Sequence, residues 1–291
     1  MIYTIENDYY KAEVNSTGAE LHSLYVKKQG FNCLWNGEPS VWPKRAPFLF
    51  PIVGKIRDDR YTLDGKEYTL TSHGFAPKSE FTLLENTKDS LRLSLKSSDA
   101  TRAMYPFDFS IISYFGFSQK SLVVTRTFEN LSPRVMPFSM GEHFGFICPF
   151  FQGEKKEEYS FTFEKEETAP RYPLTAKHLL DKPEPFLNNT RKIPITEELF
   201  KRGAVIFMGL KSKKLTYGKE GGKALLNFDF SDFSTIAFWS KYGTGIPYIC
   251  IEPWNGYDSP DDAGDDLYEK PGQIMLEPGK SRSISCSIEV V

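Results

Sequence analysis

The stretch Tyr61-Thr-Leu-Asp-Gly-Lys-Glu-Tyr-Thr-Leu70 decides the fold class, because it contains every feature of a β-hairpin. Apolar and polar side chains alternate on both sides of Asp64-Gly65, and a period of two is typical of a strand with one buried face. The Asp-Gly pair suits the tight type I′ turn that joins two antiparallel strands. The sequence therefore predicts a hairpin with its turn at Asp64 and Gly65.

Further alternating runs follow the hairpin and indicate a β-meander. Residues 90–97, 108–117 and 121–130 read as successive strands, and a Ser-Gln-Lys turn joins the last two. Helical signal is confined to one turn at 99–105 and to a short segment that begins at Thr196, whose hydroxyl is a favourable cap. The pattern predicts an all-β fold with few short helices, either a sandwich or a barrel.

The composition favours one compact unit. The chain has 291 residues, of which 40% are hydrophobic and 15% aromatic, so it can bury a large core. Between residues 154 and 187 the composition shifts to Glu, Lys and Pro, which indicates an excursion over the surface. Because alternating strands resume on both sides, we expect a single domain over 1–291.

Charge and cysteine content exclude several classes of partner. Lys and Arg number 36 against 38 Asp and Glu, and no long basic stripe is present, which argues against nucleic acid. The four cysteines show no CxxC pair, which argues against a zinc knuckle or a redox dithiol. No apolar run approaches the roughly 18 residues of a membrane span. The N-terminus lacks a basic start followed by an apolar stretch, so we expect a cytoplasmic protein without a membrane partner.

Three side chains stand out as candidates for proton transfer. Glu252 follows the apolar run that ends at Ile251 and precedes Pro and Trp, which places its carboxyl among apolar walls at the end of a strand. Such a setting raises a carboxyl pKa toward the range of a general base. His73, in His-Gly-Phe-Ala, and His143, in Gly-Glu-His-Phe, both lie beside glycines that permit close backbone approach.

Other chemistries find less support in the sequence. The histidines His73 and His143 lie far apart along the chain, so a zinc site that also uses Glu252 lacks the usual ligand spacing. The run Asp258, Asp261, Asp262, Asp265 and Asp266 lacks the EF-hand order and is interpreted as a solvated loop. A glycosidase would need a second carboxylate about 5–10 Å from Glu252. We expect neither a metal nor a cofactor.

Several motifs together resemble the aldose 1-epimerase (galactose mutarotase) family, and within it the LacX-like branch. They run from end to end of the chain in a characteristic order: Gly18-Ala-Glu-Leu-His-Ser-Leu24, Leu34-Trp35, Trp42 to Gly54, His73-Gly-Phe-Ala76, Tyr105-Pro-Phe107, Gly141-Glu-His143 and Cys250-Ile-Glu-Pro-Trp-Asn-Gly256. The resemblance implies a large antiparallel β-sandwich of the galactose mutarotase-like supersandwich type, with a sugar bound in an open cleft.

The resemblance also implies an isomerase and its catalytic residues. According to this resemblance, Glu252 is the base and His143 is the acid that together interconvert the α and β anomers of a free or phosphorylated hexose. His73 matches a second histidine that bonds near the ring oxygen. The only partner implied is a small-molecule sugar or sugar phosphate, and no cofactor is required.

The remaining candidates are substrate-binding residues. Arg45 matches an arginine of relatives thought to act on phosphorylated hexoses, and Lys55 stands where mutarotases often carry Arg. Trp254, next to Glu252, is the aromatic with the best case for packing on a sugar ring. Trp35, Trp42, Phe75 and Phe144 are further aromatic candidates that equally suit a core.

Two positions depart from the family pattern. Phe144 follows His143 where relatives commonly have Pro, and Gly203 stands where many carry a substrate-binding Asp. These departures keep open an alternative function, a non-catalytic sugar-binding or regulatory protein on the same fold. The retention of Glu252 with both histidines favours the enzyme, because binding alone needs no acid and base.

Overall fold

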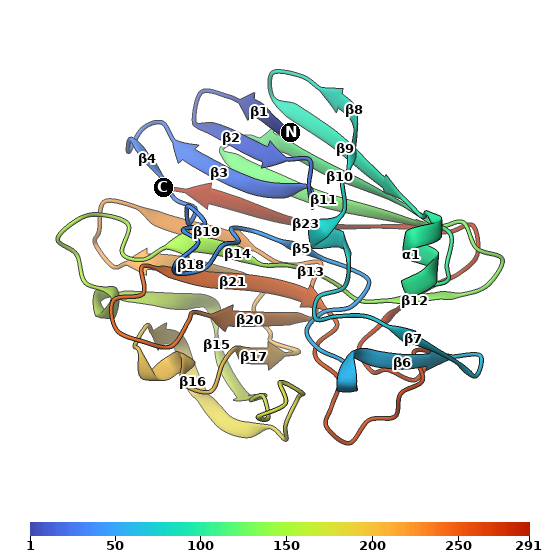
Figure 1. The fold of residues 1–291 in the computed structure, drawn as a ribbon. Helices are drawn as coiled ribbons and strands as arrows, with labels where there is room; N and C mark the ends of the chain where they lie inside the picture. The colour runs from blue at the N-terminus through green and yellow to red at the C-terminus, as the bar shows by residue number, and fades with distance from the viewer.

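The computed structural model describes residues 1–291, and almost every regular element in it is an antiparallel strand (Figure 1). The largest sheet has nine strands. In spatial order they are β16 (Glu184–Pro194), β15 (Tyr159–Arg171), β18 (Lys214–Lys219), β19 (Leu225–Asp229), β23 (Ser281–Val290), β11 (Ser121–Asn130), β10 (Phe109–Ser118), β9 (Ser90–Lys96) and β8 (Thr82–Asn86).

A second sheet of six strands packs against the first. Aromatic pairs join the two sheets: Phe161 stacks on Phe238 with ring centroids 4.0 Å apart, and Phe144 meets Phe228 at 5.8 Å. The two layers therefore form a sandwich with a phenylalanine-rich core. The strands of this sheet are β17 (Val205–Met208), β20 (Thr235–Trp239), β21 (Tyr248–Asn255), β13 (Met140–Glu142) and β5 (Phe48–Leu49), with β14 (Phe144–Ile147) also paired to β21.

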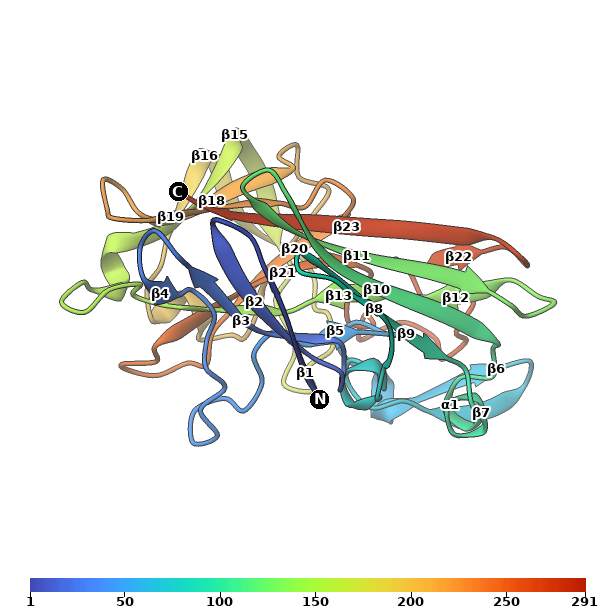
Figure 2. The ribbon, with the colours of Figure 1, turned by 90° about the horizontal axis from the view of Figure 1, so that it is seen from above.

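Smaller sheets and short helices complete the fold. The first strands form a four-stranded sheet, and two strand pairs stand apart from the large sheets. Figure 2 shows that the β6–β7 pair and the single α-helix lie at the same end of the molecule. These elements are β1 (Ile2–Glu6), β2 (Tyr10–Asn15), β3 (Glu20–Val26), β4 (Phe31–Asn32), β6 (Arg60–Leu63), β7 (Lys66–Thr69), β12 (Met136–Phe138), β22 (Ile274–Leu276), α1 (Asp99–Met104) and the 3₁₀ turns η1 (Arg57–Asp59), η2 (Ala76–Lys78), η3 (Lys156–Glu158) and η4 (Glu198–Phe200).

The sequence-based fold class is confirmed, and so is the hairpin that indicated it. Strands β6 and β7 pair as predicted, and Asp64 and Gly65 between them have φ values of 52° and 74°, as a type I′ turn requires. The meander is also present as β9, β10 and β11. The sandwich, rather than the barrel, is the architecture observed.

Two local predictions were wrong. The segment 154–187 is not a surface excursion, because it contains β15, which has 13 residues and lies in the large sheet. The exposed run Glu164–Glu166 interrupts the sequence of its buried residues, which hides the strand from a composition-based view. The segment after Thr196 forms only the 3₁₀ turn η4 and no α-helix. No helix of the structure is long and apolar enough to cross a membrane.

Candidate active site

Strand β21 carries Glu252 in the middle of the six-stranded sheet. Every residue of this strand is buried, and alternate side chains point to opposite faces. Ile249 and Ile251 join the main core, whereas Glu252 and Trp254 line a cavity of about 530 Å³ on the other face. The sequence predicted that Glu252 ends the strand, but the strand continues to Asn255, so the carboxyl lies in the cavity wall.

His143 lies between β13 and β14, which both pair with β21, and its ring is directed at Glu252. The distance from His143 Nε2 to Glu252 Oε2 is 3.1 Å. The two side chains are 10% and 2% exposed. Strand pairing thus brings together two residues more than a hundred positions apart, and the result is an imidazole and a carboxyl in direct contact, largely shielded from bulk water.

His73 completes this group from the turn that follows β7. Its backbone has a φ of 66°, and the Gly54 N–H donates to its Nδ1 at 3.2 Å. A neutral imidazole that accepts at Nδ1 carries its proton on Nε2. The ring of His73 stands perpendicular to that of His143, with centroids 5.8 Å apart. His73 is therefore prepared to donate a hydrogen bond beside the acid and base pair.

Burial dominates the electrostatics of the site. It raises the pKa of Glu252 well above its usual range, and the charge of Asp258 adds to this. It lowers the pKa of His143 well below its usual range, with smaller effects from His73 and Lys44. It also lowers the pKa of His73 to about 4. Burial therefore favours the neutral forms of Glu252 and His143, and their 3.1 Å contact couples the titration of the two groups.

Of the predicted binding residues, Lys55 and Trp254 line the cavity and Arg45 does not. The guanidinium of Arg45 donates to the carbonyl oxygen of His22 at 3.0 Å, and its backbone N–H donates to Glu20 at 2.9 Å. Arg45 is therefore used to hold its own loop. Its neighbour Lys44 is the basic residue of this loop that reaches the cavity wall.

The aromatic candidates also divide into residues that line the cavity and residues that do not. Trp42 lines the cavity with its ring 5.1 Å from that of His143, and it stacks on Tyr248 at 5.2 Å. Trp35 holds this wall indirectly, because its Nε1 donates to the carbonyl oxygen of Trp42 at 2.8 Å. Phe144 is fully buried in the main core, so its departure from the family pattern does not alter the cavity lining.

Sequence reasoning missed several lining residues. Asp258 was grouped with a solvated acidic run, yet its side chain is 5% exposed and lies in the cavity wall. Trp239 of β20 and His178 also line the cavity, and no local motif marks either of them. Gly203 does reach the wall, where the nearest side-chain atom to an added methyl group, from Leu174, would be 3.7 Å away. A methyl group at this position would thus be in ordinary van der Waals contact with Leu174.

One group of side chains lies close enough together to hold a metal ion: His143, Glu252 and Cys250. Their donor atoms all lie within 4.8 Å of one another, so Cys250 and not His73 is the third member of this cluster. Burial raises the pKa of Cys250 well above its usual range and keeps it a thiol, whereas metals bind the thiolate. The imidazole and carboxyl contact each other directly. The cluster is an imidazole and a carboxyl in contact, beside a buried thiol.

Three buried polar atoms without hydrogen-bond partners belong to Glu252, His143 and the nearby Trp254. Oε1 of Glu252, Nδ1 of His143 and Nε1 of Trp254 are buried and make no hydrogen bond within the protein. Buried polar atoms are almost always satisfied in folded proteins, so exceptions are informative. Their concentration around Glu252 indicates a site that is completed by hydrogen bonds to a bound polar molecule.

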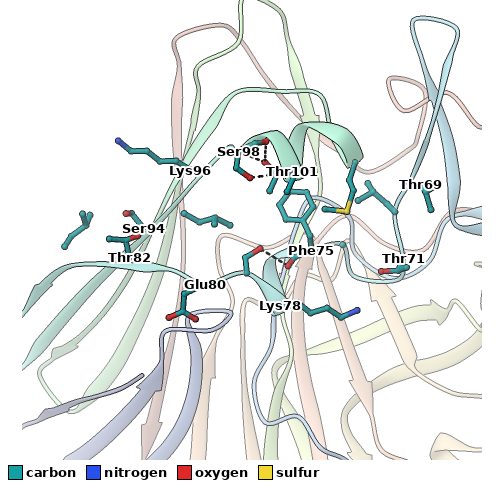
Figure 3. A pocket seen from close by; sticks show the side chains of 17 residues that line it. Thr69, Thr71, Phe75, Lys78, Glu80, Thr82, Ser94, Lys96, Ser98 and Thr101 are labelled. Atoms are coloured by element: carbon teal, nitrogen blue, oxygen red, sulfur yellow. Dashed lines mark hydrogen bonds between the residues drawn. The ribbon is translucent and has the colours of Figure 1, made fainter.

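A larger hollow of about 1000 Å³ lies on the other side of the turn that carries His73. Figure 3 shows α1 above it and Phe75 inside it, with Lys78 and Glu80 along its lower edge. This hollow has no histidine or cysteine, and the Glu80 carboxylate accepts from the Thr17 hydroxyl at 2.8 Å. It offers no acid and base pair, so the smaller cavity is the candidate active site.

Comparison with known proteins agrees with this geometry. The family described as aldose 1-epimerase matches residues 1–289. The plasmid LacX protein of Lactococcus lactis subsp. lactis is 32% identical over 301 aligned positions, which cover 100% of both chains. A galactose mutarotase related enzyme from Lactobacillus acidophilus superimposes with a TM-score of 0.95 at 34% identity, over 100% of this chain and 97% of that one. A galactose mutarotase-like protein from Lactobacillus casei gives 0.94 at 26% identity, over 100% of both chains. The chain therefore belongs to the aldose 1-epimerase family.

Proposed function

We propose that this protein is a mutarotase that interconverts the α and β anomers of a free or phosphorylated hexose. Membership of the aldose 1-epimerase family supports an epimerase role on carbohydrates. The observation that carries the proposal is the 3.1 Å contact between Glu252 and His143 in the wall of a sugar-sized cavity. Anomer exchange needs one base and one acid at the same ring, and this pair supplies both.

The reaction follows from the geometry of the pair. The reactive form is the one in which the proton of the pair lies on His143 and Glu252 is a carboxylate. A sugar enters between the two side chains, and Glu252 removes the proton of the anomeric hydroxyl while His143 delivers its proton to the ring oxygen. The bond between the anomeric carbon and the ring oxygen breaks, which leaves an open-chain aldehyde. The neighbouring carbon–carbon bond rotates, and closure on the other face returns both protons. Each positioned proton transfer typically contributes about 10²–10⁴-fold.

Neighbouring residues orient the sugar in this scheme. His73 donates from Nε2 toward the ring oxygen, because its Nδ1 is already occupied by the Gly54 N–H. Trp254 and Trp42 provide aromatic walls for the apolar face of the ring. The unpartnered Nε1 of Trp254 is a donor for a sugar hydroxyl.

Two lysines support a phosphorylated substrate as well as a free one. Lys44 and Lys55 both line the cavity, and an ammonium group binds phosphate as a point charge. Arg45 lies outside the cavity, so it is not the phosphate ligand in this proposal.

A glycosidase is the main alternative that the geometry raises. Asp258 brings a second carboxylate into the same cavity. Its Oδ1 accepts from the backbone N–H of Lys55 at 2.7 Å, whereas His143 contacts Glu252 directly. An acid and base in mutual contact favour proton exchange on one free sugar over cleavage between two sugars.

We also propose that the protein acts in the cytoplasm. All four cysteines are buried and free. Free thiols persist in a reducing compartment, which supports this location.

Polarimetry on freshly dissolved α-D-glucose and α-D-galactose tests the function, with a coupled anomer-specific assay for the 6-phosphates. The proposal expects at least one of these sugars to reach anomeric equilibrium faster than in buffer. Acceleration of none, with sugar binding still measurable, would favour the non-catalytic sugar-binding protein. Release of sugar from aryl glycosides would favour the glycosidase.

A further inference from the structure

Asp258 is a second carboxylate in the wall of the cavity that holds Glu252. A buried carboxylate needs donors or a cation to offset the loss of water. The backbone N–H of Lys55 donates to its Oδ1 at 2.7 Å. The buried ammonium of Lys270 is bound elsewhere, because it donates to the carbonyl oxygen of Tyr257 at 2.6 Å. The charge of Asp258 is therefore held in place by the backbone.

The peptide between Gly54 and Lys55 connects Asp258 to His73. Its N–H is the donor to Asp258, and its carbonyl oxygen accepts from the backbone N–H of His73 at 2.9 Å. The Gly54 N–H donates to His73 Nδ1 at 3.2 Å. A methyl group added at Gly54 would lie 2.1 Å from Asp258 Oδ1, so the carboxylate rests directly on this backbone. Displacement of Asp258 would displace the turn that presents the His73 ring.

The charge of Asp258 also acts on Glu252. Burial raises the pKa of Asp258 to about 6, so its carboxylate is ionised at neutral pH, and this charge adds to the effect of burial on the pKa of Glu252. His143 and Cys250 lie beside Glu252, and Lys270 lies near Asp258. The same cavity is also lined by the titratable residues Lys44, Lys55, Asp59, His73 and His178. A like charge near a general base strengthens the base.

We propose that Asp258 is a positioning residue of this site, whose single buried carboxylate anchors the turn that carries His73 and places a fixed negative charge beside Glu252. The inference rests on the proposed mutarotase activity. Asp258 acts through its two neighbours and not on the sugar. Its hydrogen bond and its charge have separable effects on catalysis.

Two substitutions separate these effects, measured with the sugar that the wild type accelerates most. Asp258→Asn keeps an oxygen for the Lys55 N–H but removes the charge. We expect KM within about twofold of the wild type, and the acid limb of kcat/KM moved to lower pH by about half a unit or more. Asp258→Ala also removes the acceptor, and we expect a kcat roughly 10- to 100-fold below that of Asp258→Asn, because His73 loses its position.

Asp262→Asn is the matched control, because it removes one exposed carboxylate from the same segment and should leave the pH profile unchanged. An Asp258→Asn enzyme with the wild-type acid limb, or an Asp258→Ala enzyme as active as Asp258→Asn, overturns the proposal while the mutarotase activity stands. If Asp258→Ala does not fold, the pH profile of Asp258→Asn decides alone. A wild type that accelerates no sugar removes both the activity and this role.

Discussion

His73 shows how one residue in this site combines an unusual backbone with a half-buried ring. Its φ of 66° lies in the left-handed region, which few residues other than glycine and asparagine adopt readily. Two hydrogen bonds to Gly54, one from its backbone and one to its ring, hold it there. The position of the ring is thus determined by the backbone of another segment.

The lowered pKa of His73 predicts a loss of stability in acid. Its folded pKa is about 4, whereas an unperturbed histidine has a pKa of about 6.5, so the unfolded chain binds more protons between these values. Stability therefore falls as pH drops from about 6.5 to about 4, by about 1–3 kcal/mol from this residue. His73→Asn, which tolerates the positive φ, should lose less stability over that window. Urea unfolding at pH 7, 5.5 and 4.5 measures this, and equal losses in both proteins would refute it.

The residues of the site differ in how readily the sequence reveals them. Glu252, His143 and His73 each lie in a short motif with glycine or aromatic neighbours, so they could be predicted and the fold brings them together. Lys44 and Asp258 could not, because an adjacent arginine and an acidic run conceal them. Their place in the cavity wall depends on contacts between distant segments.

At the scale of elements, a buried ion pair connects the two sheets. Arg126 of β11 donates to both oxygens of Glu142 of β13, from Nε at 2.6 Å and from Nη2 at 2.9 Å. The two side chains are 1% and 2% exposed, and the guanidinium lies 4.4 Å from the ring centre of Phe48. Glu142 immediately precedes His143, so this pair also fixes the strand that positions the proposed acid.

The buried pair predicts a non-additive response to mutation. Arg126→Met should destabilise the protein by about 3–5 kcal/mol, because it leaves the Glu142 charge buried without a partner. The double substitution of Arg126→Met with Glu142→Leu should recover most of this loss, since an apolar pair needs no compensation. Chemical denaturation of the single and double variants tests the prediction. A double variant less stable than the single one would contradict it.

Elements could be predicted where apolar and polar residues alternate regularly. Prediction failed where this alternation is irregular. The β6–β7 hairpin and the β9–β11 meander combine a period of two with clear turn residues. Strand β15 was missed because its second half is largely exposed and charged and pairs with β16 alone, and register shifts interrupt that pairing. The pairing of β13 and β14 with β21 could not be predicted either, because nothing local in the sequence specifies a long-range partner.

At the scale of the whole molecule, one dominant core predicts a single unfolding transition. One cluster of 67 buried residues runs from Ile5 to Val290 and includes side chains from both large sheets. No part of the sandwich can open without exposing this core, so we propose that residues 1–291 unfold as one domain. Differential scanning calorimetry should give equal calorimetric and van't Hoff enthalpies. Two resolved transitions would show that the sheets unfold separately.

The most direct test of the account compares wild type with Glu252→Gln for anomer exchange, by polarimetry, and for sugar binding, by titration calorimetry. The amide preserves the shape of the side chain but cannot take a proton, so we predict that acceleration is lost while the dissociation constant changes little. An unchanged rate in Glu252→Gln would contradict the account and remove Glu252 from the chemistry.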